Sequence, residues 1–265
     1  MTLMQKGANL LVVDSGVGGL SVARAIRKEL PQANIIYAAD YAAFPYGDWE
    51  ADALQKHLIR QISNWIEAYE PDCVVIACNT ASTLVLPPLR EAFEIPIVGT
   101  VPAIKPAASL SRSGMISVLA TPGTVKRDYT QSLLQEFAKG LDVQLVGSRH
   151  LAALSEQWFI NGPSDSLQNS IKQELAPCFN RADGGAQTDT IVLGCTHFPL
   201  LSDILPSLAP WPVQWIDPSS AIARRVRSVI GKKAERSTSG MFEIISSAEN
   251  KAKHVEELWE KLVLP

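Results

Sequence analysis

Two cysteines occupy matching positions in the two halves of the sequence. Cys78 lies within residues 74–80, and Cys195 lies within residues 191–197. In both segments an apolar run ends in one small residue, the cysteine follows, and two polar residues come after it. In parallel sheets, binding and catalytic sites form beyond the carboxyl ends of the strands. A helix that begins after the cysteine would also favour the thiolate through its N–H groups and its dipole. The sequence therefore predicts two reactive thiols at strand ends.

A pair of equivalent thiols suits a symmetric reaction. An unperturbed thiol titrates near pH ~8.5, so one cysteine can act as a thiolate base while the other acts as a thiol acid. Inversion of a carbon stereocentre is such a reaction, because one group removes a proton from one face and another returns a proton to the opposite face. Asp14 ends the first apolar run and His197 follows Cys195 closely, so both could assist proton transfer.

The other two cysteines, Cys73 and Cys178, are predicted to be buried structural residues, because each belongs to a regular apolar pattern. Four cysteines in 265 residues, without a C-x-x-C pair or a zinc-ligand spacing, indicate neither a disulfide scaffold nor a metal site. We therefore expect reduced thiols, no bound metal and a cytoplasmic protein.

Two further turns have the composition of anion-binding turns. Residues 14–16 and 121–124 each join an apolar run to a helical pattern, where backbone N–H groups can bind anions. The glycine-rich run 16–19 also shares part of a dinucleotide-binding fingerprint. That fingerprint would need glycine at Ser21, and Asp14 would place a carboxylate beside the pyrophosphate, so NAD binding is disfavoured. Asp14 could instead cap a helix.

These turns lie in a chain in which short apolar runs alternate with helical patterns. The predicted strands are residues 10–13, 34–39, 73–77, 95–98, 115–119, 143–146, 190–193, 213–216 and 241–245. The predicted helices are residues 18–30, 54–69, 81–93, 125–137, 151–159, 165–179, 200–208, 219–230 and 248–262, with a break or kink at Pro87 and Pro88. Apolar strands that alternate with helices indicate an α/β protein with parallel sheets covered on both faces, and nine strands suit two such sheets.

Composition and charge limit the classes of function. The chain has 24 Lys and Arg residues against 27 Asp and Glu residues, which gives a net charge of −3. This balance lacks the basic character of nucleic-acid-binding proteins, so no nucleic-acid partner is expected. No uncharged apolar run approaches ~18 residues, and no signal peptide is evident, so we expect a soluble protein without membrane association.

Four sequence blocks resemble the signature blocks of bacterial glutamate racemases, in the cofactor-independent aspartate/glutamate racemase family. The blocks are Asp14-Ser15-Gly16-Val17-Gly18-Gly19, Pro45-Tyr46-Gly47, Cys78-Asn79-Thr80-Ala81-Ser82 and Gly194-Cys195-Thr196-His197-Phe198-Pro199-Leu200-Leu201. They occur in the family's order, and the resemblance extends from about Leu10 to Ile230. It implies an isomerase that interconverts L- and D-glutamate without a cofactor and supplies D-glutamate for peptidoglycan.

The resemblance also implies roles for individual residues. Cys78 would be the base toward D-glutamate and Cys195 the base toward L-glutamate. The other positions linked to catalysis are Asp14, His197, Asp40 and Glu156. The positions that would hold the substrate are Asp14, Ser15, Tyr46, Gly47, Asn79, Thr80, Thr121, Thr124, Thr196 and His197.

The family fold implies two doubly wound, mostly parallel α/β domains related by pseudo-symmetry, with the active site in the cleft between them. Residues 1–100 plus 212–265 would form the first domain, which holds Asp14 and Cys78. Residues 101–211 would form the second, which holds Cys195 and His197. Family members are commonly dimeric, so a homodimer or a monomer–dimer equilibrium is expected.

Three other functions fit part of the sequence. A racemase of the same superfamily could act on aspartate or another acidic amino acid, although the Asp14-Ser15 and Pro45-Tyr46-Gly47 blocks favour glutamate. Cys195 with His197 could instead serve a hydrolase or an amidotransferase through acyl transfer. A binding protein for small anions could keep the strand-end turns without catalysis.

Overall fold

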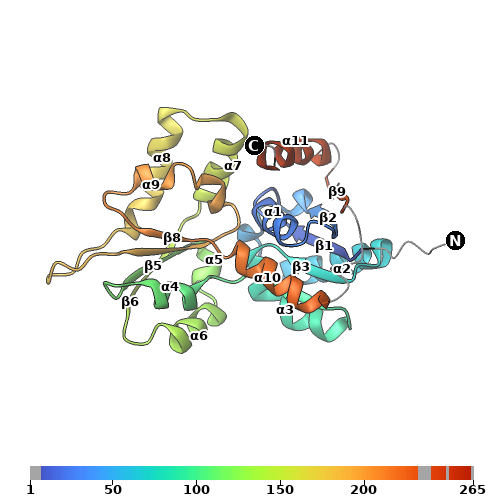
Figure 1. Cartoon of the computed structure of the whole chain (residues 1–265), viewed down its shortest axis with the longest axis horizontal. Coiled ribbons are helices and arrows are strands. Elements are labelled where there is room, and N and C mark those ends of the chain that lie inside the picture. The colour runs from blue at the N-terminus through green and yellow to red at the C-terminus, as the bar shows by residue number, and fades with distance from the viewer. Residues whose placement is uncertain (1–6, 232–239, 249–250, 264–265) are drawn as a thin grey trace. The chain divides into compact units, whose positions relative to one another are not determined.

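The computed structural model describes residues 7–231, 240–248 and 251–263, in which strands and helices alternate along the chain (Figure 1). The strands are β1 (Asn9–Asp14), β2 (Asn34–Ala39), β3 (Cys73–Ile76), β4 (Ile97–Gly99), β5 (Met115–Ala120), β6 (Asp142–Gly147), β7 (Thr190–Gly194), β8 (Gln214–Ile216) and β9 (Phe242–Ser246). The helices are α1 (Leu20–Glu29), α2 (Ala51–Tyr69), α3 (Asn79–Ala92), α4 (Ile104–Leu110), α5 (Pro122–Val125), α6 (Asp128–Phe137), α7 (Leu151–Asn161), α8 (Asp165–Leu175), α9 (Leu205–Leu208), α10 (Ser219–Ile230) and α11 (Lys251–Val263). Each strand predicted from the sequence is present in the structure. Most of the N-terminal segment in which no signal peptide was expected lies outside the described residues.

Packing divides the chain into two compact units. Unit 1 comprises Met1–Thr100 and Ser219–Pro265, and unit 2 comprises Val101–Pro218. A return to the first unit at residue 212, as the sequence analysis expects, would assign β8 to unit 1. The structure instead places β8 in unit 2, because β8 pairs in parallel with β7 and completes that sheet.

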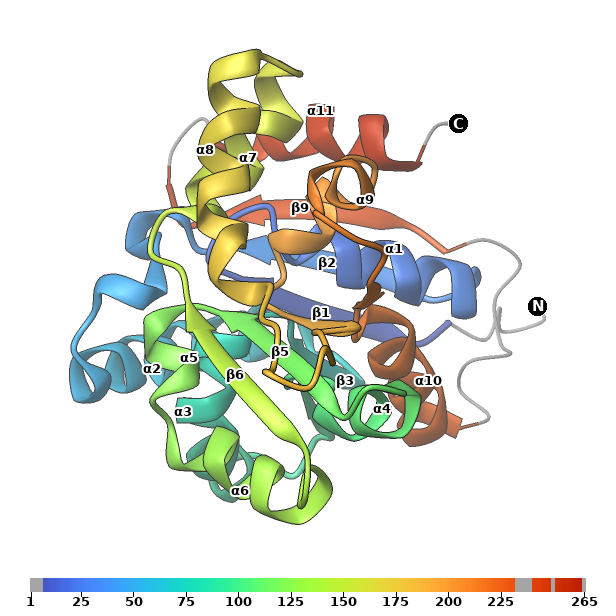
Figure 2. The same cartoon turned by 90° about the vertical axis from the view of Figure 1, so that its left-hand side faces the viewer.

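The sheet of unit 1 has the strand order β4-β3-β1-β2-β9, and every pairing in it is parallel. Leu11 and Val13 of β1 share a core with buried side chains of α2 and α3. Helices α1 and α10 pack against each other on the opposite face of this sheet (Figure 2). Because helices cover both faces, the central strands are apolar throughout rather than alternating, as predicted.

The sheet of unit 2 has the order β6-β5-β7-β8, again with parallel pairings. Ile191 and Leu193 of β7 pack with residues of α7 and α8, whereas Val192 packs with residues of α4. Alternate side chains of one strand therefore reach two separate cores, one on each face of the sheet. The prediction of two parallel sheets covered on both faces is confirmed.

The helix predictions were less accurate than the strand predictions. Helix α4 was not predicted, and the helix predicted over residues 125–137 is divided into α5 and α6. The Thr130 hydroxyl donates to the Thr124 carbonyl at 2.7 Å across this division. Helix α3 includes Pro87 and Pro88 because its buried Val85 and Leu89 hold it against the sheet. Tertiary packing thus outweighs the local cost of proline.

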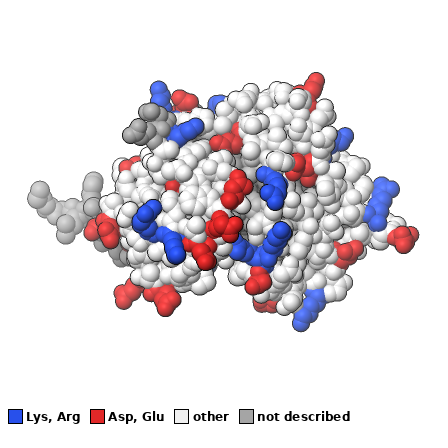
Figure 3. Space-filling model, turned by 180° about the vertical axis from the view of Figure 1, so that it is seen from behind, with Lys and Arg blue, Asp and Glu red and all other residues white. Residues whose placement is uncertain are grey.

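The surface and the helices bear on possible partners. On the face shown in Figure 3, basic and acidic side chains are interspersed, and Lys and Arg form no continuous field. That face therefore lacks the basic patch by which nucleic-acid-binding surfaces are recognised. Among residues 7–231, 240–248 and 251–263, no helix has the length and apolar character needed to cross a membrane.

Candidate active site

Consecutive strand ends of unit 1 bring together the catalytic groups expected in that unit. Asp14 ends β1, Asp40 follows β2, and Cys78 lies just beyond β3. The sheet hydrogen bonds continue past the strands: Asp40 N–H donates to the Asp14 carbonyl (2.8 Å), and Ala77 N–H donates to the Val13 carbonyl (2.7 Å). Since the strand order is β3-β1-β2, Asp14 lies on the strand between those that lead to Asp40 and Cys78.

Cys78 immediately precedes helix α3 and has an extended backbone, with φ −144° and ψ 123°. Its carbonyl accepts a hydrogen bond from Ser82 N–H at 2.9 Å, so the helix begins directly after the thiol. The side chain is 7% exposed. The prediction that a helix begins directly after Cys78 is therefore confirmed.

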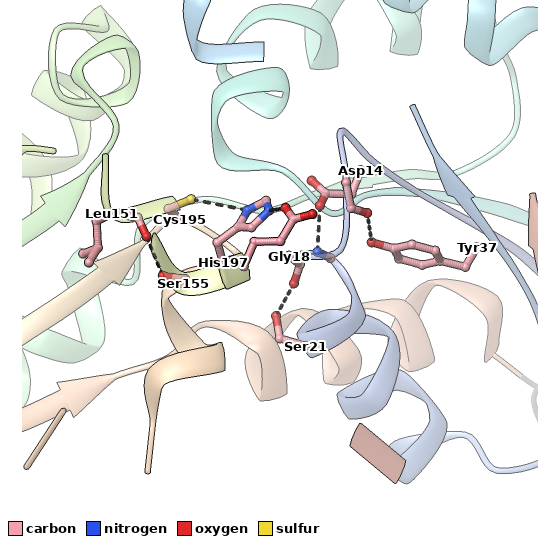
Figure 4. A network of polar contacts seen from close by, with 11 residues as sticks. Asp14, Gly18, Ser21, Tyr37, Leu151, Ser155, Cys195 and His197 are labelled. Atoms are coloured by element: carbon pink, nitrogen blue, oxygen red, sulfur yellow. Dashed lines mark hydrogen bonds and ion pairs between the residues drawn. The ribbon is translucent and has the colours of Figure 1, made fainter. Parts of the chain in front are cut away.

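The glycine run after Asp14 allows a close approach of the chain to itself. Gly19 N–H donates to Asp14 Oδ2 at 2.8 Å, and the Tyr37 hydroxyl donates to the Gly16 carbonyl at 2.8 Å (Figure 4). The hydrogen bond from Gly19 N–H supports the alternative that one oxygen of Asp14 has a local structural role. It also argues against NAD binding, because the N–H at the start of α1 is bonded to the chain's own carboxylate.

Asp40 is a fully buried carboxylate with two partners on one oxygen. The Tyr46 hydroxyl donates to Asp40 Oδ2 at 2.8 Å, and His57 Nε2 lies 2.6 Å from the same atom. Burial first, and then the negative charges of Asp40 and Cys78, raise the pKa of Tyr46 well above its usual value. Tyr46 therefore remains a protonated phenol that donates to Asp40.

The substrate-binding positions expected in unit 1 include one side chain that lacks partners. Ser15, Asn79 and Thr80 are all buried, and a Cβ built on Gly47 would meet no atom within 4 Å. Asn79 Oδ1 and Nδ2 are both buried, and neither has a hydrogen-bond partner in the described part of the chain. A buried carboxamide without partners costs stability, so Asn79 has donor and acceptor capacity for a polar ligand.

Unit 2 has corresponding groups at the ends of β5 and β7. Ala120 pairs with Gly194 across these strands, and the next residues are Thr121 and Cys195. A Cβ on Gly194 would lie 2.9 Å from the Ala120 Cβ and 3.0 Å from the Leu119 carbonyl oxygen. The small residue before Cys195 is therefore required by the close approach of neighbouring strands.

A thiol, an imidazole and a carboxylate lie close together in unit 2. Cys195 Sγ lies 4.0 Å from His197 Nδ1, and His197 Nε2 lies 3.4 Å from Glu156 Oε2 (Figure 4). Glu156 belongs to α7, which packs against the 3-10 turn η4 (Phe198–Leu201) that follows His197. A carboxylate near one ring nitrogen and a thiol near the other allow His197 to assist proton transfer at the sulfur.

Cys195 differs from Cys78 in the segment that follows it. The helix predicted over residues 200–208 is replaced by the 3-10 turn η4 and the four-residue helix α9. Pro206 would lie inside the predicted helix, where it has no N–H to donate to the carbonyl four residues earlier, whereas it is tolerated in the first turn of α9. The expectation of a helix dipole at Cys195 is therefore wrong, and His197 is the group that contacts the sulfur.

The threonines expected to bind substrate in unit 2 lie at the same strand ends. Thr121 Oγ1 accepts a hydrogen bond from Thr124 N–H at 3.3 Å and lies 3.0 Å from Thr124 Oγ1. Thr196, next to Cys195, is 4% exposed. Hydroxyls and turn N–H groups of this kind can hold a carboxylate.

The remaining cysteines have the structural character that the sequence predicted. Burial is the main cause that raises the pKa of Cys73 and that of Cys178 to about 12. None of the four cysteines forms a disulfide. Within the described ranges, no group of three or more His, Cys, Asp or Glu side chains could hold a metal ion.

Two side chains that were not predicted as site residues contact these groups. His57 lies on α2 three residues after the buried Leu54, and this helical spacing could have indicated that it faces the core. Tyr37 lies in β2, where it is fully buried, and its hydroxyl fixes the Gly16 turn. No feature of the sequence alone indicates the partner of either residue.

Comparisons with known proteins identify the family of this chain. The family described as Asp/Glu/Hydantoin racemase matches residues 20–226. A glutamate racemase of Brucella canis is 51% identical over 227 residues, which cover 85% of this chain and 81% of that protein. The crystal structure of Escherichia coli glutamate racemase in complex with L-glutamate and the activator UDP-MurNAc-Ala is 38% identical, with a TM-score of 0.86 over 96% of this chain and 95% of that chain.

A glutamate racemase isoform of Bacillus anthracis provides a more distant solved structure. It is 27% identical, and its TM-score is 0.83 over 97% of this chain and 95% of that chain. The structural similarity therefore extends over nearly the whole chain, and the family match includes Cys78 and Cys195. The chain belongs to the Asp/Glu/Hydantoin racemase family and is an enzyme of the isomerase class.

Proposed function

We propose that the protein interconverts L- and D-glutamate by proton transfer at the α-carbon, with Cys78 and Cys195 as the two acid–base groups. The observation that carries the proposal is the matched placement of these thiols, each just beyond the carboxyl end of a parallel strand and each among buried polar groups. The 51% identity to a Brucella canis glutamate racemase supports glutamate as the substrate. So does the L-glutamate bound by the Escherichia coli relative.

In the proposed mechanism the two thiols exchange roles with the direction of reaction. With D-glutamate, the Cys78 thiolate takes the α-proton, the C–H electron pair remains on the substrate as a carbanion, and the Cys195 thiol returns a proton to the opposite face. With L-glutamate, Cys195 is the base and Cys78 the acid. The enzyme ends each turnover with its protonation pattern reversed, so the overall reaction consumes neither an oxidant nor a reductant.

The proposed supporting roles follow the positions of the side chains. Asp14 lies at the strand end next to that of Cys78, and Asp40 lies at the following strand end, while His197 and Glu156 would assist Cys195. The buried Asn79 amide would bind a substrate carboxylate or the ammonium group. The remaining groups proposed to hold the substrate are Asp14, Ser15, Tyr46, Gly47, Thr80, Thr121, Thr124, Thr196 and His197.

We further propose that the reaction needs no metal or organic cofactor and that its D-glutamate enters peptidoglycan in the cytoplasm. A homodimer or a monomer–dimer equilibrium is proposed for the oligomeric state, which light scattering of the purified protein would measure. The thiol chemistry requires reduced cysteines, since a disulfide would remove the acid and the base together.

The direct test follows the α-hydrogen in deuterated water. Protein freed of metals and pyridoxal phosphate is incubated with L- or D-glutamate, and circular dichroism and mass are recorded. Loss of ellipticity with uptake of one deuterium is expected for both enantiomers. Absence of exchange with either enantiomer would overturn the proposal, exchange with aspartate alone would reassign the substrate, and ammonia release from glutamine would indicate an amidotransferase.

Substitutions then test the two-thiol mechanism. Cys78→Ser and Cys195→Ser should each lower racemisation by about 10³-fold or more, because a hydroxyl is a far weaker acid than a thiol. Cys178→Ala is the matched control, since this thiol is fully buried, its carbonyl accepts from Ser117 in the middle of β5, and only a loss of stability is expected. Full turnover in Cys78→Ser would contradict the two-thiol mechanism and would indicate a mechanism with a single thiol.

A further inference from the structure

The contact of His57 with Asp40 extends the polar groups near Cys78 toward the surface. His57 Nε2 lies 2.6 Å from Asp40 Oδ2; the imidazole side chain is 15% exposed and the carboxylate is 0% exposed. We propose that His57 is a positioning residue for racemisation, which acts through Asp40 and Tyr46 on the surroundings of Cys78. This inference rests on the proposed function of Cys78.

Asp40 needs a partner because its carboxylate is removed from water. Its Oδ2 has Tyr46 and His57 as partners, and among the described residues Oδ1 has no hydrogen-bond partner. Within the described part of the chain, no other Lys, Arg or His nitrogen lies within 4.0 Å of this carboxylate. A buried carboxylate that loses such a partner is strongly destabilised, so its side chain must move.

A change at Asp40 reaches Cys78 through Tyr46. The Tyr46 hydroxyl is held by Asp40 Oδ2 at 2.8 Å, and the Tyr46 and Cys78 side chains belong to the same buried core cluster. The charges of Cys78 and Asp14 also act on the Tyr46 phenol. In addition, the Asp40 main chain is joined to that of Asp14 by a 2.8 Å hydrogen bond. Displacement of Asp40 would therefore alter the groups around the thiol.

The position of His57 is fixed by packing rather than by its hydrogen bond alone. Leu54 and Leu58, on the same helix, are fully buried and anchor α2 to the sheet. The Trp49 ring packs against the imidazole, with 5.2 Å between the ring centroids and 36° between the planes. The imidazole is therefore pre-organised toward Asp40, which is the requirement for a positioning residue.

Three variants separate the hydrogen bond from the bulk of the ring. His57→Phe keeps the ring and removes the donor, His57→Asn shortens the side chain, and His57→Gln retains a nitrogen donor at similar reach. We expect kcat to fall about 10-fold in His57→Phe and His57→Asn, with a smaller change in KM, and to recover in large part in His57→Gln. His254→Phe, on α11 of the same unit, is the control and should retain wild-type kinetics.

Kinetic isotope effects locate the change at one thiol. Because the equilibrium constant of racemisation is one, kcat/KM must fall equally in both directions and cannot identify the affected thiol. If proton transfer at Cys78 is slowed, the primary isotope effect should rise with D-[2-²H]glutamate, because Cys78 removes the deuteron of that enantiomer. The isotope effect should fall with L-[2-²H]glutamate, because Cys195 removes the deuteron of that enantiomer. A purely structural loss of active protein would change neither value.

A second readout needs no glutamate. The alkylation rate of Cys78 by iodoacetamide, followed by peptide mass spectrometry, should change at least 3-fold in His57→Phe, while that of Cys195 stays constant. Unchanged isotope effects and unchanged Cys78 alkylation in folded His57→Phe or His57→Asn would overturn the inference. If the wild-type protein does not racemise glutamate, the proposed function fails, whereas the alkylation rates still decide whether His57 acts on Cys78.

Discussion

Asp14 Oδ2 accepts the main-chain N–H of Gly19 at 2.8 Å, and this bond is formed where a side chain on residue 19 would not fit. A Cβ there would lie 2.7 Å from the Asp14 Cβ and 2.9 Å from the Tyr37 hydroxyl. The backbone of Gly19 itself is helical, with φ −62°. The glycine is therefore required by space rather than by its conformational freedom.

Gly19→Ala is expected to destabilise the protein and to displace Asp14. Steric overlap of this kind costs about 1–3 kcal/mol in the free energy of unfolding, which urea denaturation would measure. Racemisation should fall as well, because the displaced carboxylate belongs to the proposed site. Gly184→Ala is the matched control, since a Cβ at that position meets nothing within 4 Å. Equal stability of the two variants would contradict the prediction.

Asn79→Ala should reduce activity without reducing stability. The Asn79 amide is buried without hydrogen-bond partners in the described residues, so its removal should leave the free energy of unfolding unchanged or raise it by about 1 kcal/mol. Ser82→Ala, on the same helix, provides the contrast. Its hydroxyl donates to the Ile76 carbonyl and accepts from Thr100 N–H, so its loss should destabilise the protein. A clear loss of stability in Asn79→Ala would mean that the amide serves the fold.

Asp189 should contribute stability that depends on pH. Burial alone would raise its pKa, but hydrogen bonds from Ser113, Ser111, Arg112 and Thr190 together lower the pKa of this carboxyl. Because the folded-state pKa lies below the unfolded value near ~3.9, the contribution is complete above that value. It is lost as the pH falls through the folded-state pKa.

Asp189→Asn should therefore be less stable than the wild type at neutral pH, and the difference should shrink as the pH falls below about 4. Chemical denaturation at a series of pH values would measure it. Asp183→Asn, in an exposed loop, is the control and should show little change at any pH. A difference for Asp189→Asn that is independent of pH would exclude the ionised carboxylate as its source.

Alkylation should divide the four cysteines into two classes. With a pKa of about 12, only about one in 10⁴ Cys73 or Cys178 side chains is a thiolate at pH 8. Both residues are also 0% exposed. Iodoacetamide should therefore modify neither residue in the folded protein. Cys78 and Cys195, at 7% and 8% exposed, should react, and glutamate should protect them. Labelling of Cys73 before Cys78 would contradict this division.

Residue patterns alone predicted the strands and the placement of Cys78 and Cys195 just beyond strand ends. A continuous apolar run such as residues 10–13 is stable only when it is buried on both faces, so its identity as a parallel strand follows from local pattern. The same logic placed Cys78 and Cys195 at strand ends, where polar residues interrupt the runs. Helices were harder to predict, because α3 and the segment after Cys195 depend on packing and proline positions rather than on periodicity.

Which side chains meet depends on the folded chain. His57 and Asp40 come from different elements, as do Glu156 and His197, so no local pattern predicts either contact. The same holds for β8, whose place in unit 2 follows from its pairing with β7. Periodicity reports which side of an element is buried, but the partner on that side is selected by long-range packing. The proposed chemistry was therefore readable from residue types, whereas the groups proposed to tune it could be found only in the folded chain.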